Sequence, residues 1–522
     1  MTTLAAMGDP AEGPLVLTGF DLTLDQLFAV ARERRPVAIH PGARERMRAA
    51  RDVVEQALER GDEVYGLNTG VGVNRRVRVD PAKAAAAGAA LLREHRVGQG
   101  PPAPTEVVRG TMLVLANGFA RGVAGVSPEL AERVVDALNA GEVPTIRSLG
   151  SVGQADLAPL ADLAAAIVGQ RPLRAGEALA LIDNGAFSTA WAGLAMTDAG
   201  VLAETLDVAG ALSLEAFAAN LDHFHPAIAA TRPYPGMSRS LERIRSLLEG
   251  SSAWEPDSAR NLQDPLSFRS LPHVNGALHD ALRFAGDQLA IELNASQGNP
   301  IVVVEEHRLI PVANFDFVPL AQALDLARIA IASAVTSSTE RALKLLDAAW
   351  SGLPTGLAGP EDRPESLGIG MLGIAAQALA VEARMLAQPV SHELASTTEA
   401  EGTEDRTSIA SLGARRLSEQ VDLSGRVEAI ELAVAARALA IRRPRAIGVG
   451  IGRVLAAVTE VLPWVTDRAR PGPPDVEPLL EAVRSGSLTR RTTSDYPRGE
   501  GSTSAQTDGS STPSGSQGGE DP

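Results

Sequence analysis

Four short segments carry residue types that can transfer protons or bind an acid. Residues 65–72 read Tyr-Gly-Leu-Asn-Thr-Gly-Val-Gly, a glycine-punctuated loop headed by a tyrosine. Residues 150–160 read Gly-Ser-Val-Gly-Gln-Ala-Asp-Leu-Ala-Pro-Leu, a loop that leads into a helical pattern. Residues 263–269 end on an arginine after a turn, and residues 403–408 set a glutamate among polar neighbours. Tyrosine and glutamate can act as acids or bases, and arginine pairs with both oxygens of a carboxylate. Each segment alone also has a purely structural interpretation.

The elements that must position these segments are helices. Apolar residues recur at three- and four-residue spacing over 41–61, between a proline and a glycine. Longer Ala- and Leu-rich patterns without internal proline cover 319–346, 372–386 and 427–441. Strand-like residues are scarce apart from 301–304. The sequence therefore predicts an all-α protein with long core helices.

Composition excludes several classes of function. The net charge of −16 argues against nucleic acid or an anionic membrane as partner. The absence of cysteine excludes disulfides, thiolate metal sites and cysteine nucleophiles. Lys83 and Lys344 are the only lysines, and both lie in helical patterns, which argues against pyridoxal chemistry. Without a basic, apolar leader or a run of 18 apolar residues, we expect a soluble, cytoplasmic protein.

No metal or cofactor motif is convincing. His223 and His225 are two residues apart, so they could hold a metal together only in extended backbone, and Pro226 follows them. Residues 448–452 lack the last glycine of a dinucleotide fingerprint and follow a helix rather than a strand. We therefore predict no metal site and no bound nucleotide.

The chain divides into four regions by composition and pattern. We expect a flexible arm over 1–19, an N-terminal region with the tyrosine loop over 20–150, and a central helical bundle with C-terminal helices over 151–485. Residues 486–522 form a Ser/Gly/Thr-rich tail with little to bury, which predicts disorder.

Taken together and in this order, the segments resemble the histidine and aromatic amino acid ammonia-lyases, including the aminomutases. The resemblance covers residues 20–485. It extends to further stretches that match the family's motifs: 91–100 with His95, 177–183, 224–236, 294–300 and 313–315. It implies a long helical bundle, a homotetramer, and active sites built from three subunits, with Tyr65 and Glu404 from different chains.

One departure from the family is central. Family members make a methylidene-imidazolone electrophile by cyclising and dehydrating an Ala-Ser-Gly triplet. Here Gln154-Ala155 stands where three residues should be. The chemistry needs a serine hydroxyl to leave and a glycine nitrogen to attack, and neither is present at this point. We therefore predict that the group is absent and that the protein has no cofactor.

Other pocket positions also differ, while an acid–base set is kept. Asp183 replaces an asparagine, Leu266 a tyrosine and Asp316 a histidine. Five family residues remain: Tyr65, His95, Arg269, Phe315 and Glu404. The resemblance implies catalytic roles for Tyr65, His95 and Glu404, and substrate binding by Arg269, Asp183, Asn314, Phe315, Leu266, Asn68 and Gln154.

The roles follow from side-chain chemistry. Tyr65 would remove a proton from the substrate's β-carbon, but an ordinary tyrosine, with a pKa near 10, is only about 0.1% ionised at pH 7, a cost of roughly 4 kcal/mol. Arg269 would bind a carboxylate, Asp183 would favour a basic group, and Glu404 would accept or donate a proton or bind a cation. Asn68 also has a simpler interpretation as a turn residue.

Without the electrophile, expulsion of ammonia from an ordinary amino acid becomes much harder. We therefore expect a reassigned lyase that couples proton abstraction to elimination, isomerisation or cyclisation on an amino-acid-like or carboxylate substrate. The alternative is a non-catalytic protein that binds a ligand or a partner subunit. A conventional ammonia-lyase is the third interpretation.

Overall fold

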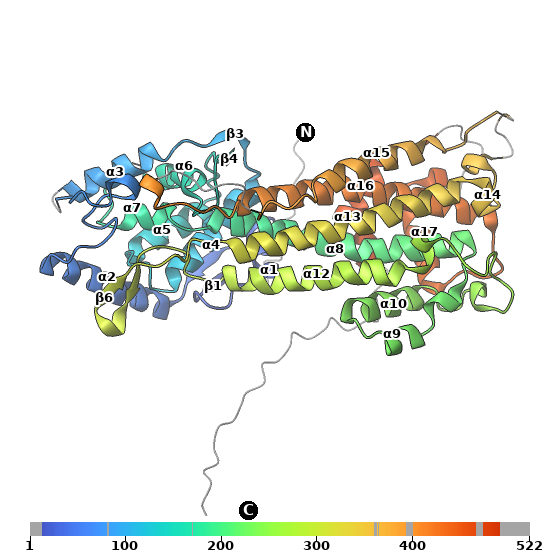
Figure 1. The fold of residues 1–522 in the computed structure, drawn as a ribbon, viewed down its shortest axis with the longest axis horizontal. Coiled ribbons are helices and arrows are strands. Elements are labelled where there is room, and N and C mark those ends of the chain that lie inside the picture. Colours follow the sequence, from blue (N-terminus) through green and yellow to red (C-terminus); the bar gives the residue numbers. More distant parts are fainter. Residues whose placement is uncertain are drawn as a thin grey trace, which may run out of the picture.

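The computed structural model describes residues 13–80, 83–169, 171–359, 363, 365–392, 400–465 and 473–490. It is elongated, with short helices and small sheets at one end and long helices running from there to the other (Figure 1). The predicted all-α class is confirmed, because the sheets have only two short strands each. Residues 1–12 of the expected arm and residues 491–522 of the expected tail lie outside the described residues.

The N-terminal region consists of short helices around two small sheets. Strand β1 (Leu15–Leu17) pairs in parallel with β2 (Val37–Ile39), so these residues of the expected arm are part of the fold. Strand β3 (Gln99–Pro102) pairs antiparallel with β4 (Arg147–Leu149). The helices are α1 (Leu24–Ala31), α2 (Pro41–Arg60), α3 (Ala84–Glu94), α4 (Thr105–Ala120), α5 (Pro128–Asn139), α6 (Leu157–Val168) and α7 (Glu177–Ile182).

Four long helices form the bundle and lie side by side in Figure 1. They are α8 (Ala186–Phe217), α12 (Leu271–Glu292), α13 (Val318–Leu346) and α16 (Ala410–Arg442), with α15 (Met371–Met385) packed against α13 and α16. The helices predicted over 319–346 and 372–386 are confirmed, whereas the pattern at 427–441 is only the second half of α16. Their many buried alanines allow close approach of the helices.

Shorter elements complete the far end of the bundle and the edge of the N-terminal region. The helices are α9 (Ala227–Thr231), α10 (Pro235–Leu247), α11 (Leu266–Arg269), α14 (Ala348–Ser351), α17 (Val449–Val461), α18 (Glu477–Arg484) and α19 (Ser487–Arg490). Thus the first residues of the expected tail are helical. Strand β5 (Ile301–Val303), where the sequence suggests a strand, pairs antiparallel with β6 (Arg308–Ile310).

Helix α13 is apolar and long enough to cross a membrane by length and composition alone, although the sequence shows no uninterrupted apolar run of that length. Its most apolar window is 61% buried inside the fold, and it packs along α12 and α16. That environment is typical of a core helix.

The bundle core contains a buried charge cluster on α8, α13 and α16. Arg341 donates to both oxygens of Glu431 at 2.6 and 2.8 Å, and Ser213 Oγ donates to the same carboxylate at 2.6 Å. Glu428, one turn before Glu431, is fully buried. Burial raises the pKa of Glu428, and the Glu431 charge raises it further. At neutral pH Glu428 is therefore expected to be a protonated acid.

Glu428→Gln is expected to stabilise the protein increasingly as pH rises. The unfolded chain releases the Glu428 proton above about pH 4.5, while the folded chain keeps it, so wild-type stability falls from there up to the raised pKa. Thermal unfolding at pH 5 and pH 8 measures the difference. The control is Glu431→Gln, which leaves Arg341 unpaired and should cost about 3–5 kcal/mol. Equal pH dependence of wild type and Glu428→Gln would contradict the assignment.

Candidate active site

The tyrosine loop holds the Tyr65 hydroxyl in place. Gly66 has a φ of +68°, and a side chain there would overlap Leu179, so this turn requires glycine. The loop then folds back, and the backbone N–H of Gly72 donates to the Tyr65 hydroxyl oxygen at 3.0 Å. Burial raises the pKa of Tyr65, while the Gly72 hydrogen bond opposes that rise. The Tyr65 hydroxyl is thus held in place, but its ionisation at neutral pH requires a further interaction that stabilises the negative charge.

Asn68 serves this loop rather than an open pocket. Its side-chain oxygen accepts from Val64 N at 2.9 Å, and its amide donates to Asp62 O at 2.6 Å. Both partners lie just before Tyr65. The simpler interpretation of Asn68 as a turn residue is therefore the one the contacts support.

The segment that carries Glu404 lies against the tyrosine loop. The short 3₁₀ turn Ala400–Gly402 contacts the turn Gly72–Asn74. Glu404 is close enough to Tyr65 for its charge to raise the pKa of the phenol, and Asp183 has the same effect. The expectation that Tyr65 and Glu404 come from different chains is therefore wrong, because one chain supplies both.

Asp183 forms the third member of this group. It is buried at the end of α7, just before α8 begins. Burial raises its pKa to about 8, the nearby Glu404 raises it too, and a hydrogen bond with the Asn299 backbone opposes the rise. Asp183 is thus mostly a neutral acid at pH 7, rather than the fixed charge that the sequence suggests. A bound cation would favour its ionised form.

The loop that replaces the Ala-Ser-Gly region is pinned by the start of α16. Ser408 Oγ donates to Gly153 O at 2.5 Å, and Ile409 N donates to Val152 O at 3.0 Å. Gly153 has a φ of +77°, and a side chain there would overlap Ser408. The loop conformation therefore depends on glycine at 153.

The other side of this loop contacts the segment before α13. Ala155 N donates to Phe315 O at 3.2 Å, and Gln154 and Asp316 form an antiparallel bridge. The side-chain oxygen of Gln154 is buried and has no hydrogen-bond partner among the described residues. Phe315 thus meets the loop through its backbone, and Gln154 retains an unused acceptor.

Asp156 connects the loop to α8. It occupies the N-cap position of α6, but its side chain makes no capping hydrogen bond. Its carboxylate accepts instead from Ser188 N at 2.7 Å, Ser188 Oγ at 2.8 Å and Ser151 Oγ at 2.8 Å. These bonds fix the loop against the first turn of α8.

His95 and Asn314 make local contacts. His95 ends α3, and its Nδ1 lies 2.8 Å from Leu91 O. Asn314 is exposed, and its amide donates to Ser296 O at 3.1 Å. Neither lines a cavity that Tyr65 lines. Their predicted roles therefore gain no support from the contacts within one chain.

Arg269 and Leu266 lie at the opposite end of the bundle. Both belong to α11, where Phe268 stacks on Phe217, the last residue of α8, at 4.1 Å between ring centroids. Asp183 lies just before the first residue of the same helix. A helix of 32 residues is about 48 Å long. Within one chain, Arg269 and Leu266 are therefore not brought to Tyr65.

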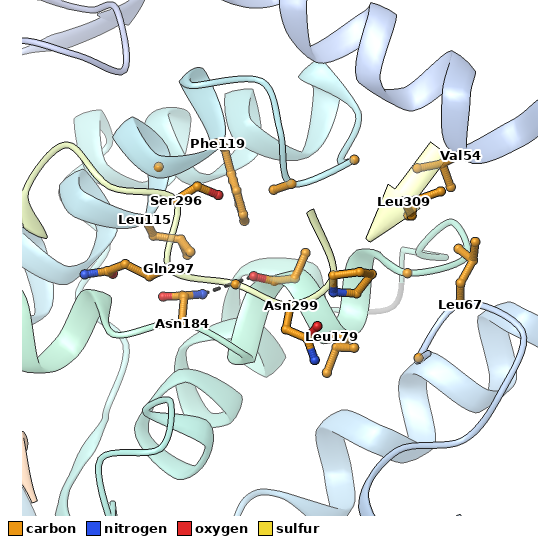
Figure 2. Close-up of a pocket in the computed structure, with 18 of the residues that line it drawn as sticks. Val54, Leu67, Leu115, Phe119, Leu179, Asn184, Ser296, Gln297, Asn299 and Leu309 are labelled. Atoms are coloured by element: carbon orange, nitrogen blue, oxygen red, sulfur yellow. Dashed lines mark hydrogen bonds between the residues drawn. The ribbon is translucent and has the colours of Figure 1, made fainter. Parts of the chain in front are cut away.

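A cavity of about 60 Å³ opens beside Tyr65 within the N-terminal region (Figure 2). Apolar side chains dominate its wall, among them Val54, Leu67, Leu115, Phe119 and Leu179. A few amides and a hydroxyl join them: Asn184, Ser296, Gln297 and Asn299. The volume is enough for a few waters or a small apolar group.

Sequence reasoning missed two residues that organise the site. Arg75 links the tyrosine loop to the Glu404 segment through Gly72 O and Ala400 O. Ser408 was within the segment singled out but had no assigned role. Neither belongs to a motif with a known spacing, so only the long-range contacts identify them.

Within the described ranges, no group of three or more His, Asp or Glu side chains could hold a metal ion. His225, one of the two histidines considered for that role, uses its Nδ1 to accept from Ala227 N at 3.1 Å.

Comparisons with known proteins agree with this architecture. A family model described as aromatic amino acid lyase matches residues 22–460. A histidine ammonia-lyase of Deinococcus radiodurans is 34% identical and aligns over 90% of this chain and 94% of its own length. Among solved structures, the ergothioneine-degrading ergothionase of Treponema denticola has a TM-score of 0.84 and 28% identity, covering 91% of this chain and 99% of its own. A tyrosine aminomutase of Streptomyces globisporus has a TM-score of 0.83 and 26% identity, covering 92% and 98%.

Proposed function

The chain belongs to the aromatic amino acid lyase family and is a lyase-type enzyme, and from this we propose that it eliminates an amine from an amino-acid-like substrate without a methylidene-imidazolone ring. One observation carries the proposal: Gln154-Ala155 stands in the loop where the family has its three-residue ring-forming triplet. Tyr65, Asp183 and Glu404 nevertheless lie close together. The loop contacts the segments of two of them, because Asp156 N donates to Asn184 O and Ser408 Oγ donates to Gly153 O.

The residues in the loop do not fit the ring. Gln154 and Ala155 offer no hydroxyl that could leave as water. The Ala155 N–H donates to Phe315 O, so the nitrogen at this point is held in an ordinary backbone bridge. Ser151 points to Asp156 and is followed by Val152. We therefore assign no step of the reaction to such a group.

The proposed reaction is a β-elimination. Tyr65 takes the proton from the β-carbon, the C–H electron pair forms the carbon–carbon double bond, and the α C–N bond breaks with its electrons leaving on nitrogen. A primary amine is a poor leaving group without an electrophile. A quaternary ammonium leaves as a neutral tertiary amine and needs no proton, so this substrate class suits a ring-free site.

The neighbour that degrades ergothioneine supports this substrate class, because ergothioneine is an N-trimethylated amino acid derivative. A cation bound beside Tyr65 and Asp183 would lower the pKa of both groups, and Glu404 lies close enough to act on the same two. The substrate would thus help to ionise its own base and favour the charged form of Asp183. We propose a small cationic carboxylate as substrate and a cytoplasmic location.

A second copy of the chain is proposed to complete the site. Arg269 and Leu266, the positions the family resemblance assigns to substrate, lie about a helix length from Asp183. The outer faces of α12, α13 and α15 carry exposed apolar side chains: Phe284, Ile291, Leu326, Ile329, Met371, Ile374, Val381 and Met385. Antiparallel packing of copies through these faces would bring Arg269 of one chain to Tyr65 of another, as in a homotetramer.

Mixed assemblies test the shared site. Tyr65→Phe and Arg269→Gln chains are each expected to have strongly reduced turnover alone, because each assembly then lacks one required group. Co-refolded mixtures should regain part of the wild-type turnover, since some sites receive an intact Tyr65 and an intact Arg269. Absence of recovery in a mixture shown to contain both chains would contradict a site shared between chains.

A mass-spectrometric turnover screen tests the reaction itself. The panel holds primary amino acids, their N-trimethylated forms and β-substituted carboxylates. We expect release of trimethylamine from an N-trimethylated member and no release of ammonia from plain histidine, phenylalanine or tyrosine. No turnover of the whole panel by a folded protein would instead favour the non-catalytic, ligand-binding interpretation.

A further inference from the structure

We propose that Arg75 is a positioning residue that locks the Glu404 segment onto the tyrosine loop and presents a positive charge to Tyr65. Its effect on catalysis rests on the proposed function, but its structural role does not. Arg75 follows the loop's last glycine by three residues and belongs to no motif.

The contacts of Arg75 connect two distant parts of the chain. Its Nη1 donates to Gly72 O at 3.3 Å and to Ala400 O at 3.2 Å, and its Nη2 donates to Glu401 at 3.0 Å. Hydrogen bonds from a charged donor to backbone carbonyls are stronger than neutral ones. The turn Ala400–Gly402 is thus fastened two residues before Glu404.

The same glycine holds both Arg75 and Tyr65. The Gly72 carbonyl accepts from Arg75, while the Gly72 N–H donates to the Tyr65 hydroxyl. A shift of Arg75 would therefore move the donor on which the phenol depends. The tyrosine loop, Arg75 and the Glu404 segment are therefore joined by one set of hydrogen bonds.

Arg75 and Tyr65 line the same cavity, so the charge of Arg75 can act on the phenol. The two side chains line one cavity of about 350 Å³, together with Glu63, Val64, Thr69, Pro300, Leu309 and Pro311. The Arg75 side chain is only 21% exposed, so solvent screens it less than a free surface charge. The proline and leucine side chains keep this part of the wall apolar.

The charges around Tyr65 oppose one another. Burial is the largest cause that raises the pKa of Tyr65, and the carboxyls of Glu404 and Asp183 add to it. The Gly72 N–H and the Arg75 charge act in the other direction. Two negative charges partly offset the positive charge of Arg75: that of Glu401, which pairs with it, and that of Glu63 in the cavity wall. Loss of Arg75 would thus leave the phenol facing mainly negative groups.

Three variants separate the role of Arg75 from a general effect of lost charge. Arg75→Gln removes both the positive charge and the planar guanidinium group with its several N–H donors. Arg75→Lys keeps the charge without that donor geometry. Arg78→Gln is the matched control, since Arg78 lies on the same loop but is exposed and pairs with Glu63 at the surface. Circular dichroism establishes that each variant is folded at every pH used.

Hydrogen exchange and tyrosinate absorbance are the two measurements. Peptides covering 65–75 and 400–409 should exchange at least tenfold faster in Arg75→Gln than in wild type or Arg78→Gln. The chain has three tyrosines, so subtraction of a Tyr65→Phe titration isolates Tyr65. Its ionisation should move to higher pH by about one unit in Arg75→Gln and by less in Arg75→Lys.

Each outcome decides one part of the proposal. If the two peptides exchange at the same rate in Arg75→Gln and in Arg78→Gln, Arg75 does not hold the Glu404 segment on the tyrosine loop. If Tyr65 ionises at the same pH in Arg75→Gln as in wild type, Arg75 has no electrostatic role. Neither readout requires turnover, so both can succeed even if the proposed reaction fails. If turnover is found, the acid limb of the kcat profile should shift to higher pH in Arg75→Gln and be partly restored in Arg75→Lys.

Discussion

Tyr65→Phe is expected to lower kcat by about 10²–10⁴, the usual contribution of a positioned general base. The variant keeps the ring that fills the loop and removes only the hydroxyl that accepts from Gly72. Substrate affinity should change much less, because the phenol acts on the reacting C–H bond. Steady-state kinetics on the best substrate of the turnover screen measures both quantities.

Tyr234→Phe is the matched control for this experiment. Tyr234 is 54% exposed just before α10, at the far end of the bundle, and its ring lies 5.2 Å from the Arg232 guanidinium carbon. Loss of its hydroxyl should leave kcat unchanged. Tyr65→Phe with a kcat within about twofold of wild type would remove Tyr65 as the base.

Asp183→Asn is expected to abolish the pH dependence of cation binding. In wild type, Asp183 must lose its proton to pair with a cation, and its pKa is raised to about 8. Affinity for N-trimethylhistidine should therefore rise by up to tenfold per pH unit between pH 6 and pH 8, then level off. In Asp183→Asn the affinity should be lower at pH 8 and nearly flat.

Calorimetric titration in two buffers of different ionisation enthalpy checks this directly. Wild type should release a proton on binding at pH 7, and Asp183→Asn should release fewer. Asp405→Asn is the control, because Asp405 is an exposed acid next to Glu404 and should keep the wild-type response. Equal proton release by wild type and Asp183→Asn would show that another group pairs with the cation.

Local features were predictable because local physics determines them. Helix α2 begins at Pro41 and ends at Arg60, where Gly61 caps it with a φ of 72°, as the proline and glycine in the sequence indicate. The 29-residue α13 follows from its Ala- and Leu-rich pattern, which contains no internal proline after its first turn. The family resemblance identified Tyr65, Asp183 and Glu404 as candidate site residues. In the structure, one chain brings these three side chains close together.

The remaining features depend on contacts between distant segments. Periodicity does not indicate that Phe268, the neighbour of Arg269, stacks on the last residue of α8, whereas Asp183 precedes its first residue. Nor does spacing indicate that Arg75 donates to Ala400, or that Asp156 binds Ser188 instead of capping its own helix. The raised pKa of Asp183 is a consequence of burial, which the sequence alone does not quantify.

The most direct test of the central claim is an intact-mass measurement on the same preparation that is assayed for turnover. We predict the mass of the unmodified chain, with no loss of water from the peptide spanning residues 150–160, in protein that releases trimethylamine from an N-trimethylated amino acid. A chain that has lost water at this loop and releases ammonia from plain histidine would contradict the account.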